Sequence, residues 1–260
     1  MPYFRTKYRT FARLKRPKPM KAIVIGATSG IGRDLVKILA QNDYTVTATG
    51  RRAELLQSLQ TECGTDKVRI ATMDVTDLDG SRALLLQIIQ DMQGIDLVVI
   101  NAGIGETSTR WEKELAIINT NATGFAALAN AAYYYFDTQN GGKGHIVGIS
   151  SVAGEVGNGK SPVYSATKAF ISRYMQGLRF RNIQRKTNIA ITDVRPGFID
   201  TPMTQKNKFY MPWLASSDRA AQQIYSDIKH RRNVTYITRR WRLVSWLIAL
   251  LPDRLLGKVI

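Results

Sequence analysis

The sequence predicts one α/β domain in which a parallel sheet of about seven strands is covered by helices on both faces. Short apolar runs alternate with longer segments of helical apolar spacing from residue 21 to residue 240, and this alternation is typical of βαβ units. The 260 residues, of which 44% are hydrophobic, suffice for one large core. No repeat or low-complexity linker divides the series, so we expect a doubly wound fold without a domain boundary.

The expected elements follow from the spacing of apolar residues in each segment. "KAIVIG" and "IDLVVINAG" are short continuous apolar runs that fit buried strands, whereas "RDLVKILAQ" repeats apolar residues at intervals of three and four. By these criteria the strands cover 21–26, 44–50, 67–75, 95–103, 144–151, 188–197 and 235–240. The helices cover 33–41, 53–62, 81–92, 111–136 and 161–182, the fourth as one long helix.

The formal net charge of +17 is concentrated at the two ends of the chain. Residues 1–20 carry seven basic and no acidic residues, residues 229–260 carry eight basic and one acidic, and the middle has a net charge of only +3. We therefore expect no nucleic-acid partner for the body, and keep nucleic-acid binding through the basic ends as an alternative. A single cysteine excludes an internal disulfide framework, and two distant histidines predict no metal site. We expect a cytoplasmic protein.

The sequence divides into a basic extension (1–19), the main domain (20–238) and an amphipathic C-terminal helix (239–260). The extension lacks the apolar run of a secretory signal. We expect it to be disordered, and we favour a binding arm or a leader before a start at Met20 over an organellar presequence. The apolar part of 239–260 is too short to cross a bilayer. It fits either a helix lying on an anionic membrane or one packed against protein.

The first turn between strand and helix, "GATSGIG" (26–32), is rich in glycine. Glycine there permits a tight turn and a close approach of the backbone to a dinucleotide diphosphate, which a helix N-terminus attracts. The spacing differs from GxGxxG, and glycines needed only for packing are the alternative interpretation. The residues that we expect to contact the cofactor are Gly26, Thr28, Ser29, Gly30, Ile31 and Gly32.

The second strand ends in "TGRRAE", where Arg51 and Arg52 follow Gly50. An acidic residue at this position would bind the ribose 2′-hydroxyl of NAD, whereas arginine suits the 2′-phosphate of NADP. The sequence therefore predicts a preference for NADP(H), with NAD(H) as the alternative. Two solvated arginines at a helix start are the structural interpretation of the same pattern.

In "SPVYSATKAF", Tyr164 and Lys168 lie four residues apart in an expected helix. That spacing places both side chains on one face. A nearby ammonium favours the phenolate, so we expect Lys168 to lower the pKa of Tyr164. Such a phenol is suited to exchange a proton with a substrate.

Together the motifs resemble the short-chain dehydrogenase/reductase family, whose fold is Rossmann-like. They cover roughly residues 20–203, in the family's order and at its usual intervals. The matching motifs are "GATSGIG" (26–32), "DV" (74–75), "NAG" (101–103), "NTNATG" (119–124), "ISS" (149–151), "YSATK" (164–168) and "RPGFIDTPM" (195–203).

The resemblance implies a role for each matching residue. Tyr164 would be the catalytic acid and base, Lys168 would also bind the nicotinamide ribose, Ser151 would hydrogen-bond the substrate carbonyl, and Asn121 would hold a water for proton relay. Ser150 competes with Ser151, and the family's interval to Tyr164 selects Ser151. The other implied cofactor contacts are Asp74 and Val75 at the adenine, Asn101, Ala102 and Gly103 along the adenosine, and Pro196, Gly197, Ile199 and Thr201 around the nicotinamide.

We therefore expect an oxidoreductase that transfers a hydride between NADP(H) and a carbonyl or secondary alcohol. The alternatives are a non-catalytic dinucleotide sensor or scaffold and a nucleic-acid-binding protein. The segment 203–219 contains Phe209, Tyr210, Met211 and Trp213, which suit an apolar wall or lid of the site or a packed surface helix. An apolar substrate is expected on that ground. The resemblance also implies a homodimer or homotetramer built from the helices around 111–136 and 161–182.

Overall fold

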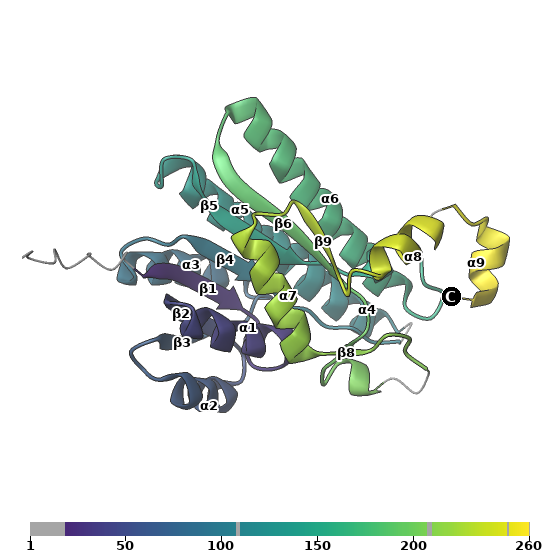
Figure 1. Cartoon of the computed structure of the whole chain (residues 1–260), viewed down its shortest axis with the longest axis horizontal. Coiled ribbons are helices and arrows are strands. Elements are labelled where there is room, and N and C mark those ends of the chain that lie inside the picture. Colours follow the sequence, from purple (N-terminus) through teal and green to yellow (C-terminus); the bar gives the residue numbers. More distant parts are fainter. Residues whose placement is uncertain (1–18, 108–109, 207–209, 249, 260) are drawn as a thin grey trace, which may run out of the picture.

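The computed structural model describes residues 19–107, 110–206, 210–248 and 250–259. Its centre is a seven-stranded sheet in the order β3-β2-β1-β4-β5-β6-β9, with every neighbouring pair parallel (Figure 1). The prediction of about seven parallel strands is confirmed. These strands are β1 (Met20–Ile25), β2 (Tyr44–Gly50), β3 (Val68–Thr72), β4 (Leu97–Ile100), β5 (Lys143–Ile149), β6 (Asn188–Pro196) and β9 (Val234–Ile237).

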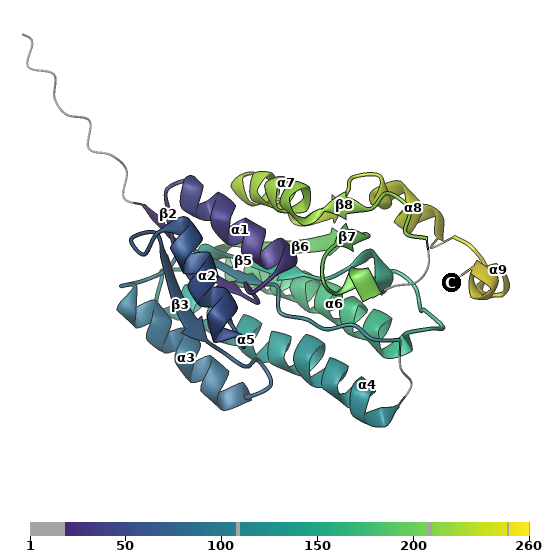
Figure 2. The same ribbon diagram turned by 90° about the horizontal axis from the view of Figure 1, so that it is seen from below.

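Helices cover both faces of the sheet in two layers (Figure 2). One layer contains α1, α2 and α7, and the other contains α3, α4, α5 and α6. Right-handed crossovers between parallel strands produce such an arrangement. The helices of the two layers are α1 (Gly30–Gln41), α2 (Ala53–Cys63), α3 (Leu78–Asp91), α4 (Trp111–Ile118), α5 (Phe125–Thr138), α6 (Pro162–Arg185) and α7 (Ser217–Lys229).

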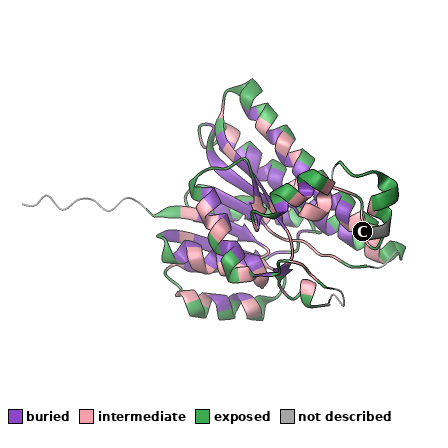
Figure 3. Ribbon diagram, turned by 45° about the vertical axis from the view of Figure 1, so that its right-hand side comes forward, coloured by how far each residue is buried: buried purple, intermediate pink, exposed green. Residues whose placement is uncertain are grey.

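Each central strand is apolar on both sides because each side meets a helix layer. In β1, Ala22 and Val24 pack toward α1 and α7, whereas Ile23 and Ile25 pack toward α3 and α5. This alternation divides the core into two clusters, one on each face of the sheet. The buried strands appear as purple arrows between the helices in Figure 3. The rigid sheet places all the loops that follow its strands along one edge.

Several elements differ from those expected. Helix α7 was not expected, and it supplies the crossover from β6 to β9. The long helix of 111–136 contains a π-helical turn, η1 (Asn119–Gly124), between α4 and α5. Two short strands outside the main sheet, β7 (Ile199–Asp200) and β8 (Ala215–Ser216), pair in parallel. Short 3₁₀ turns η2 (Val152–Gly154) and η3 (Thr204–Lys206) complete the loops.

The C-terminal segment forms two helices, so the expectation of a single helix over 239–260 is wrong. Helix α8 covers Trp241–Ile248 and α9 covers Asp253–Val259. Pro252 lacks a backbone N–H and disfavours helical dihedral angles at Leu251, so the helix cannot continue through it. Among the described residues, no helix is both long and apolar enough to cross a membrane. The extension of residues 1–19 lies, except for residue 19, outside the described part.

Candidate active site

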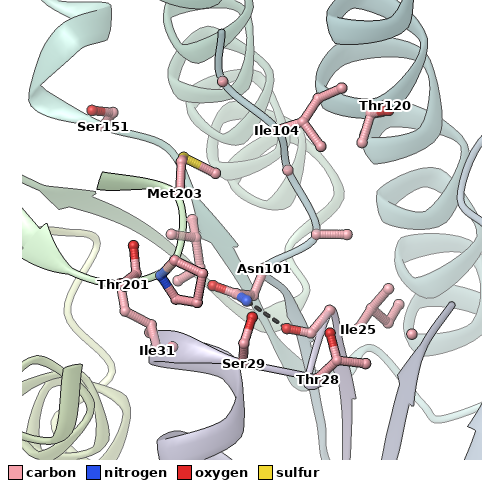
Figure 4. Close-up of a pocket in the computed structure, with 18 of the residues that line it drawn as sticks. Ile25, Thr28, Ser29, Ile31, Asn101, Ile104, Thr120, Ser151, Thr201 and Met203 are labelled. Atoms are coloured by element: carbon pink, nitrogen blue, oxygen red, sulfur yellow. Dashed lines mark hydrogen bonds between the residues drawn. The ribbon is translucent and has the colours of Figure 1, made fainter. Parts of the chain in front are cut away.

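A cleft of about 740 Å³ opens at the carboxyl ends of the strands. It lies where the connections change direction, between β1 and β4, which is where doubly wound sheets bind ligands. Figure 4 shows side chains from both strand ends around this space, with Ser29 after β1 and Asn101 after β4. The Nδ2 of Asn101 donates to the carbonyl oxygen of Gly26 at 2.6 Å and ties the two edges together (Figure 4).

The glycine-rich turn has the shape of a phosphate cradle. Gly26 has φ of +90°, and a Cβ there would lie 2.5 Å from the backbone nitrogen of Ala102. Gly30 has φ of +56° and begins α1. The side chain of Ser29 makes no capping hydrogen bond, and the first turn of α1 has no acidic residue. The N-terminal N–H groups of α1 therefore remain available to an anion in the cleft.

Gly32 does not line the cleft, unlike the other residues expected from this turn. A Cβ there would lie 2.2 Å from the carbonyl oxygen of Gly26 and 2.6 Å from Nδ2 of Asn101. Gly32 thus allows α1 to pack closely on the turn. Close packing of this kind is what the third glycine of such turns commonly provides, and a cofactor contact at Gly32 stays a prediction.

Both arginines after β2 line the cleft, and Arg52 is fixed there. Its guanidinium donates to Oγ1 of Thr28 at 2.6 Å and to Oγ of Ser29 at 3.1 Å. Arg51 is exposed and lies near Asp74, whose carboxylate it stabilises. A cation held beside two hydroxyls of the turn after β1 is chemically suited to a phosphate group.

The opposite wall of this half of the cleft is formed by the residues after β3 and β4. Asp74 accepts hydrogen bonds from the backbone and hydroxyl of Thr76 at 3.0 and 2.8 Å, and these bonds hold the pKa of its carboxyl below the usual value. Val75 is buried against η1, since a Cβ at Gly124 would lie 2.4 Å from its carbonyl oxygen. The expected lining residues here are all in place: Asp74, Val75, Asn101, Ala102 and Gly103.

At the other end of the cleft, the first turns of α6 present Tyr164 and Lys168. Pro162 occupies the start of the helix, where its missing N–H costs nothing. Lys168 is buried, and its Nζ donates to the carbonyl oxygen of Ile149 at 3.0 Å and lies 5.7 Å from the centroid of the Tyr164 ring. Burial lowers the pKa of Lys168 to about 8, against a smaller opposing effect of Asp193.

The pKa of Tyr164 differs from the expectation that Lys168 lowers it. Burial raises the pKa of the phenol above its usual value of 10, and a hydrogen bond with Ser151 is the weaker, opposing effect. Loss of hydration penalises the phenolate, while the ammonium of Lys168 is directed at Ile149. In this structure Tyr164 is therefore held as a protonated phenol, a proton donor.

The structure separates the two adjacent serines. Ser150 donates from its hydroxyl to the carboxylate of Asp193 and to the carbonyl oxygen of Val194, so its side chain is occupied in the core. Ser151 Oγ accepts from the backbone of Ala153 at 3.1 Å and lies 3.4 Å from the carbonyl oxygen of Pro196. Figure 4 shows Ser151 at the cleft opposite Met203. These contacts favour Ser151 over Ser150 as the hydroxyl that faces a substrate.

Asn121 lies on the π-helical turn and is fully buried. Its Oδ1 accepts from the backbone of Ile104 at 2.8 Å, while its Nδ2 donates to the carbonyl oxygen of Ile104 at 2.8 Å and to Oγ1 of Thr167 at 3.3 Å. Oδ1 of Asn121 and Nζ of Lys168 approach the same residue, since a Cβ at Gly103 would lie 3.3 and 3.4 Å from them. Asn121 thus fixes the loop after β4 beside Lys168, although it does not line the cleft itself.

The end of β6 and the segment after it form one wall of the cleft, where the sequence predicted contacts with the nicotinamide. Pro196, Gly197, Ile199 and Thr201 all line the cleft. The backbone N–H of Thr201 donates to Oγ1 of Thr204 at 3.0 Å. A Cβ at Gly30 would lie 2.8 Å from the methyl group of Thr201. The cradle at α1 and the segment after β6 are therefore in direct contact.

Several lining residues were not predicted. Most belong to the loop after "NAG" or to the segment after Thr201, and Thr120 belongs to η1. They include Ile104, Gly105, Glu106, Thr120, Met203 and Thr204. Continuity with the predicted motifs was the available signal. Conversely, Tyr210, Met211 and Trp213 are not among the lining residues, so they do not form the apolar wall that was one interpretation of this segment. Phe209 lies outside the described residues.

Comparisons with known proteins agree with this geometry. The family model for short chain dehydrogenases matches residues 20–209. The chain belongs to the short-chain dehydrogenase family. It is thus an NAD(P)-dependent oxidoreductase of the short-chain dehydrogenase/reductase type, and the predicted family is confirmed.

Curated relatives carry the corresponding names. An uncharacterized oxidoreductase of Myxococcus xanthus is 38% identical over 207 residues, which are 77% of this chain and 80% of the relative. An NADP-dependent 3-hydroxy acid dehydrogenase of Escherichia coli, YdfG, is 32% identical over 69% of this chain and 73% of the relative.

Solved structures of other short-chain dehydrogenases superpose on most of the chain. ElxO with NADP bound has a TM-score of 0.74 at 25% identity and covers 84% of this chain and 97% of its own. A serine dehydrogenase complexed with NADP⁺ has a TM-score of 0.72 at 26% identity, over 84% of this chain and 94% of its own.

Within the described residues, no group of three histidine, cysteine or carboxylate side chains is arranged to hold a metal ion.

Proposed function

We propose that the chain interconverts a carbonyl and a secondary alcohol with NADP(H), and that Tyr164 is the general acid and base. The observation that carries the proposal is the meeting of Tyr164, Ser151 and Lys168 at one end of the cleft whose other end contains the glycine-rich turn and Arg52. A dinucleotide has the length and the two chemically distinct ends that such a cleft requires.

The residues of the cleft fit a dinucleotide. The turn at Gly26 and Gly30 leaves room that a side chain would fill, and the N-terminus of α1 suits the diphosphate. Arg52, with Thr28 and Ser29, would hold the 2′-phosphate. When bound, the nicotinamide supplies or accepts the hydride. The named NADP-dependent relatives support the same preference, and NAD(H) is the alternative.

The chain's own residues manage one proton and one developing charge. During reduction, negative charge forms on the substrate oxygen, where the hydroxyls of Ser151 and Tyr164 would donate hydrogen bonds to it. Tyr164, whose pKa is raised by burial, is protonated at neutral pH and can give its proton to that oxygen. Lys168 would stabilise the resulting phenolate, and Asn121 would hold a water that returns the proton from solvent.

The substrate end favours a neutral, apolar carbonyl compound. Ile104 and Met203 line it, and Met203 lies near the Tyr164 ring, since a Cβ at Gly105 would approach both side chains. Among the described lining residues the only cation at this end is Lys168, while Glu106 is acidic. A substrate carboxylate, such as the one named for YdfG, would find no free arginine there.

Replacing Tyr164 with phenylalanine tests the proposed reaction. NADPH consumption is measured against a panel of aliphatic and aromatic ketones and aldehydes, and NADPH affinity is measured by titration calorimetry. We expect turnover to fall roughly 100- to 10,000-fold, which is the range for loss of a general acid, with NADPH affinity retained.

In the wild type, reduction should slow as the pH rises above about 8, because Lys168 then loses its charge.

Two outcomes would contradict the proposal. Equal turnover by wild type and Tyr164→Phe would remove Tyr164 from the chemistry. Tight NADPH binding without turnover of any carbonyl, in either direction and at any pH, would favour a dinucleotide sensor.

The variant Ser151→Ala tests the second hydroxyl, and Ser150→Ala is its matched control. Loss of turnover in Ser151→Ala at unchanged NADPH affinity is expected, whereas Ser150→Ala should act mainly on stability.

We further propose a homodimer or homotetramer that assembles through α4, α5 and α6. These helices lie in one layer (Figure 2) and expose large apolar side chains, including Trp111, Tyr134 and Phe170. Exposed apolar side chains on the helices of one layer support a contact between copies of the chain.

A further inference from the structure

Helix α8 exposes large apolar side chains, together with Arg242. Its buried side carries Trp241 and Ser245, and within the described residues Ser245 Oγ has no hydrogen-bond partner. Its outer side carries Leu243, Trp246 and Leu247, of which Leu243 is 69% and Trp246 65% exposed. A helix at a water-facing surface normally shows the opposite arrangement, with apolar residues inward and polar residues outward. The outer side of α8 therefore suits an apolar environment.

The apolar side chains continue beyond α8. Leu250, Leu251 and Leu255 are exposed along the turn and the start of α9. Figures 1 and 2 show α9 at the periphery of the molecule, farther from the sheet than α8, and Figure 3 shows this end mostly in the exposed colour. We call the following six residues the C-terminal apolar surface: Leu243, Trp246, Leu247, Leu250, Leu251 and Leu255.

Cationic side chains border this surface. Arg239, Arg240, Arg242 and Arg254 are exposed, and none of them takes part in an ion pair within the described residues. The only acidic residue between residues 239 and 260 is Asp253. Long arginine side chains can keep their guanidinium groups in a polar layer while their stems cover apolar surface.

A shallow groove of about 380 Å³ separates α8 from the body. Arg242, Leu243, Ser245 and Trp246 line it from α8, and Glu155 and Tyr236 line it from the body. Leu243 and Trp246 therefore border this groove and are largely exposed. The carboxylate of Glu155 already accepts hydrogen bonds from Arg195 and from the hydroxyl of Tyr236, at 2.6 and 3.0 Å. Glu155 is thus engaged within the protein, where it shares Arg195 with Asp193, and the exposed charged side chain of α8 itself, Arg242, is positive.

We infer that the C-terminal apolar surface docks the protein on an anionic lipid bilayer. Helix α8 is only about 12 Å long at the α-helical rise, far less than a bilayer core, so it would lie in the plane of the interface. Leucine and tryptophan would enter the boundary between headgroups and acyl chains, and the arginines would contact anionic headgroups. This inference does not depend on the proposed reaction, since it concerns a surface outside the cleft.

Vesicle flotation with the full chain tests the inference. Vesicles of phosphatidylcholine with 30% phosphatidylglycerol, roughly the content of an anionic leaflet, are compared with pure phosphatidylcholine. We expect the wild type to float with the anionic vesicles and less with neutral ones, and to dissociate at high salt. Trp246→Ser/Leu247→Ser should lower the partition coefficient at least tenfold, and Arg240→Gln/Arg242→Gln about tenfold or more.

Matched variants make each outcome interpretable. Leu86→Ser/Ile183→Ser removes two exposed apolar side chains elsewhere, and Lys143→Gln/Lys186→Gln removes two cations elsewhere; both should float like the wild type. Equal flotation of Trp246→Ser/Leu247→Ser and wild type would overturn the inference and point to the basic residues 1–19. Absence of flotation, with a lower mass of Trp246→Ser/Leu247→Ser in light scattering, would show a contact between copies of the chain and would also overturn it.

Discussion

At the scale of single residues, Arg52 and Arg51 differ in the contacts of their guanidinium groups. Both side chains are exposed, but the guanidinium of Arg52 is held by Thr28 and Ser29, whereas Arg51 lies beside Asp74. A guanidinium already fixed by two hydroxyls loses less conformational freedom when it binds a phosphate than a freely moving one. The two arginines were equivalent in the sequence, and their hydrogen bonds distinguish them.

Substitution of Arg52 by glutamine should therefore weaken NADPH binding more than NADH binding. Loss of a charged hydrogen bond of about 1.5–3 kcal/mol corresponds to roughly 10- to 150-fold in affinity. Arg51→Gln is the control and should have a smaller effect on NADPH. Titration calorimetry with both nucleotides on each variant measures the difference. A loss of equal size for NADPH and NADH in Arg52→Gln would show that Arg52 does not contact the 2′-phosphate.

At the scale of secondary-structure elements, the contact between α1 and the first turn depends on the missing side chain of Gly32. The carbonyl of Gly26 and the amide of Asn101 occupy the space that a Cβ would need. The backbone of the same turn, 26–30, also forms the glycine-rich cradle of the cleft. Stability and cofactor binding therefore share one close contact in this part of the fold.

We expect opposite effects from the same substitution in two helices. Gly32→Ala forces an overlap and should lower the free energy of unfolding by about 1–3 kcal/mol, with weaker NADPH binding. Gly177→Ala lies at an exposed position of α6 where nothing is within 4 Å of the added Cβ, so it should raise that free energy by up to about 1 kcal/mol. Urea unfolding measures both. A neutral Gly32→Ala would contradict the close packing of α1.

The sequence predicted the elements whose local pattern agrees with their tertiary role. The strands β1 and β4 were visible because both of their faces are buried, and Tyr164 and Lys168 because helical spacing places them together. The π-helical turn at Asn121 was not visible, since its helical pattern continues and only the hydrogen bonds to Ile104 reveal it. Nor was the raised pKa of Tyr164, because burial depends on the whole fold.

At the scale of the whole molecule, helix α8 of the C-terminal segment packs against residues next to the lining of the cleft. Trp241 of α8 packs against Phe198 and Trp213, with ring centroids 5.6 and 5.4 Å apart and edge-to-face geometry. Its indole also covers the lining residue Gly197, where a Cβ would lie 1.9 Å from Nε1. Trp213 has φ of +55°, which is unfavourable for a bulky residue, so contact with Trp241 helps to hold it.

Trp241 is therefore a positioning residue for the segment that begins at Pro196. Trp241→Ala should lower the free energy of unfolding by about 3–5 kcal/mol, and it should raise KM more than it lowers kcat because the lining at Gly197 loses its support. Trp246→Ala, on the exposed side of the same helix, should change the free energy of unfolding by less than about 0.5 kcal/mol. Urea unfolding and steady-state kinetics at a temperature where both variants are folded measure these effects.

Trp241→Phe separates packing from hydrogen bonding. Among the described residues the indole Nε1 is buried without a partner. A phenyl ring should therefore restore the wild-type KM and most of the free energy of unfolding that Trp241→Ala loses. The remaining loss in the free energy of unfolding should reflect only the smaller buried area of the phenyl ring. If Trp241→Phe were as impaired as Trp241→Ala, the indole N–H would be required and the packing argument would fail. If Trp241→Ala were destabilised with an unchanged KM, α8 would stabilise the domain without supporting the cleft.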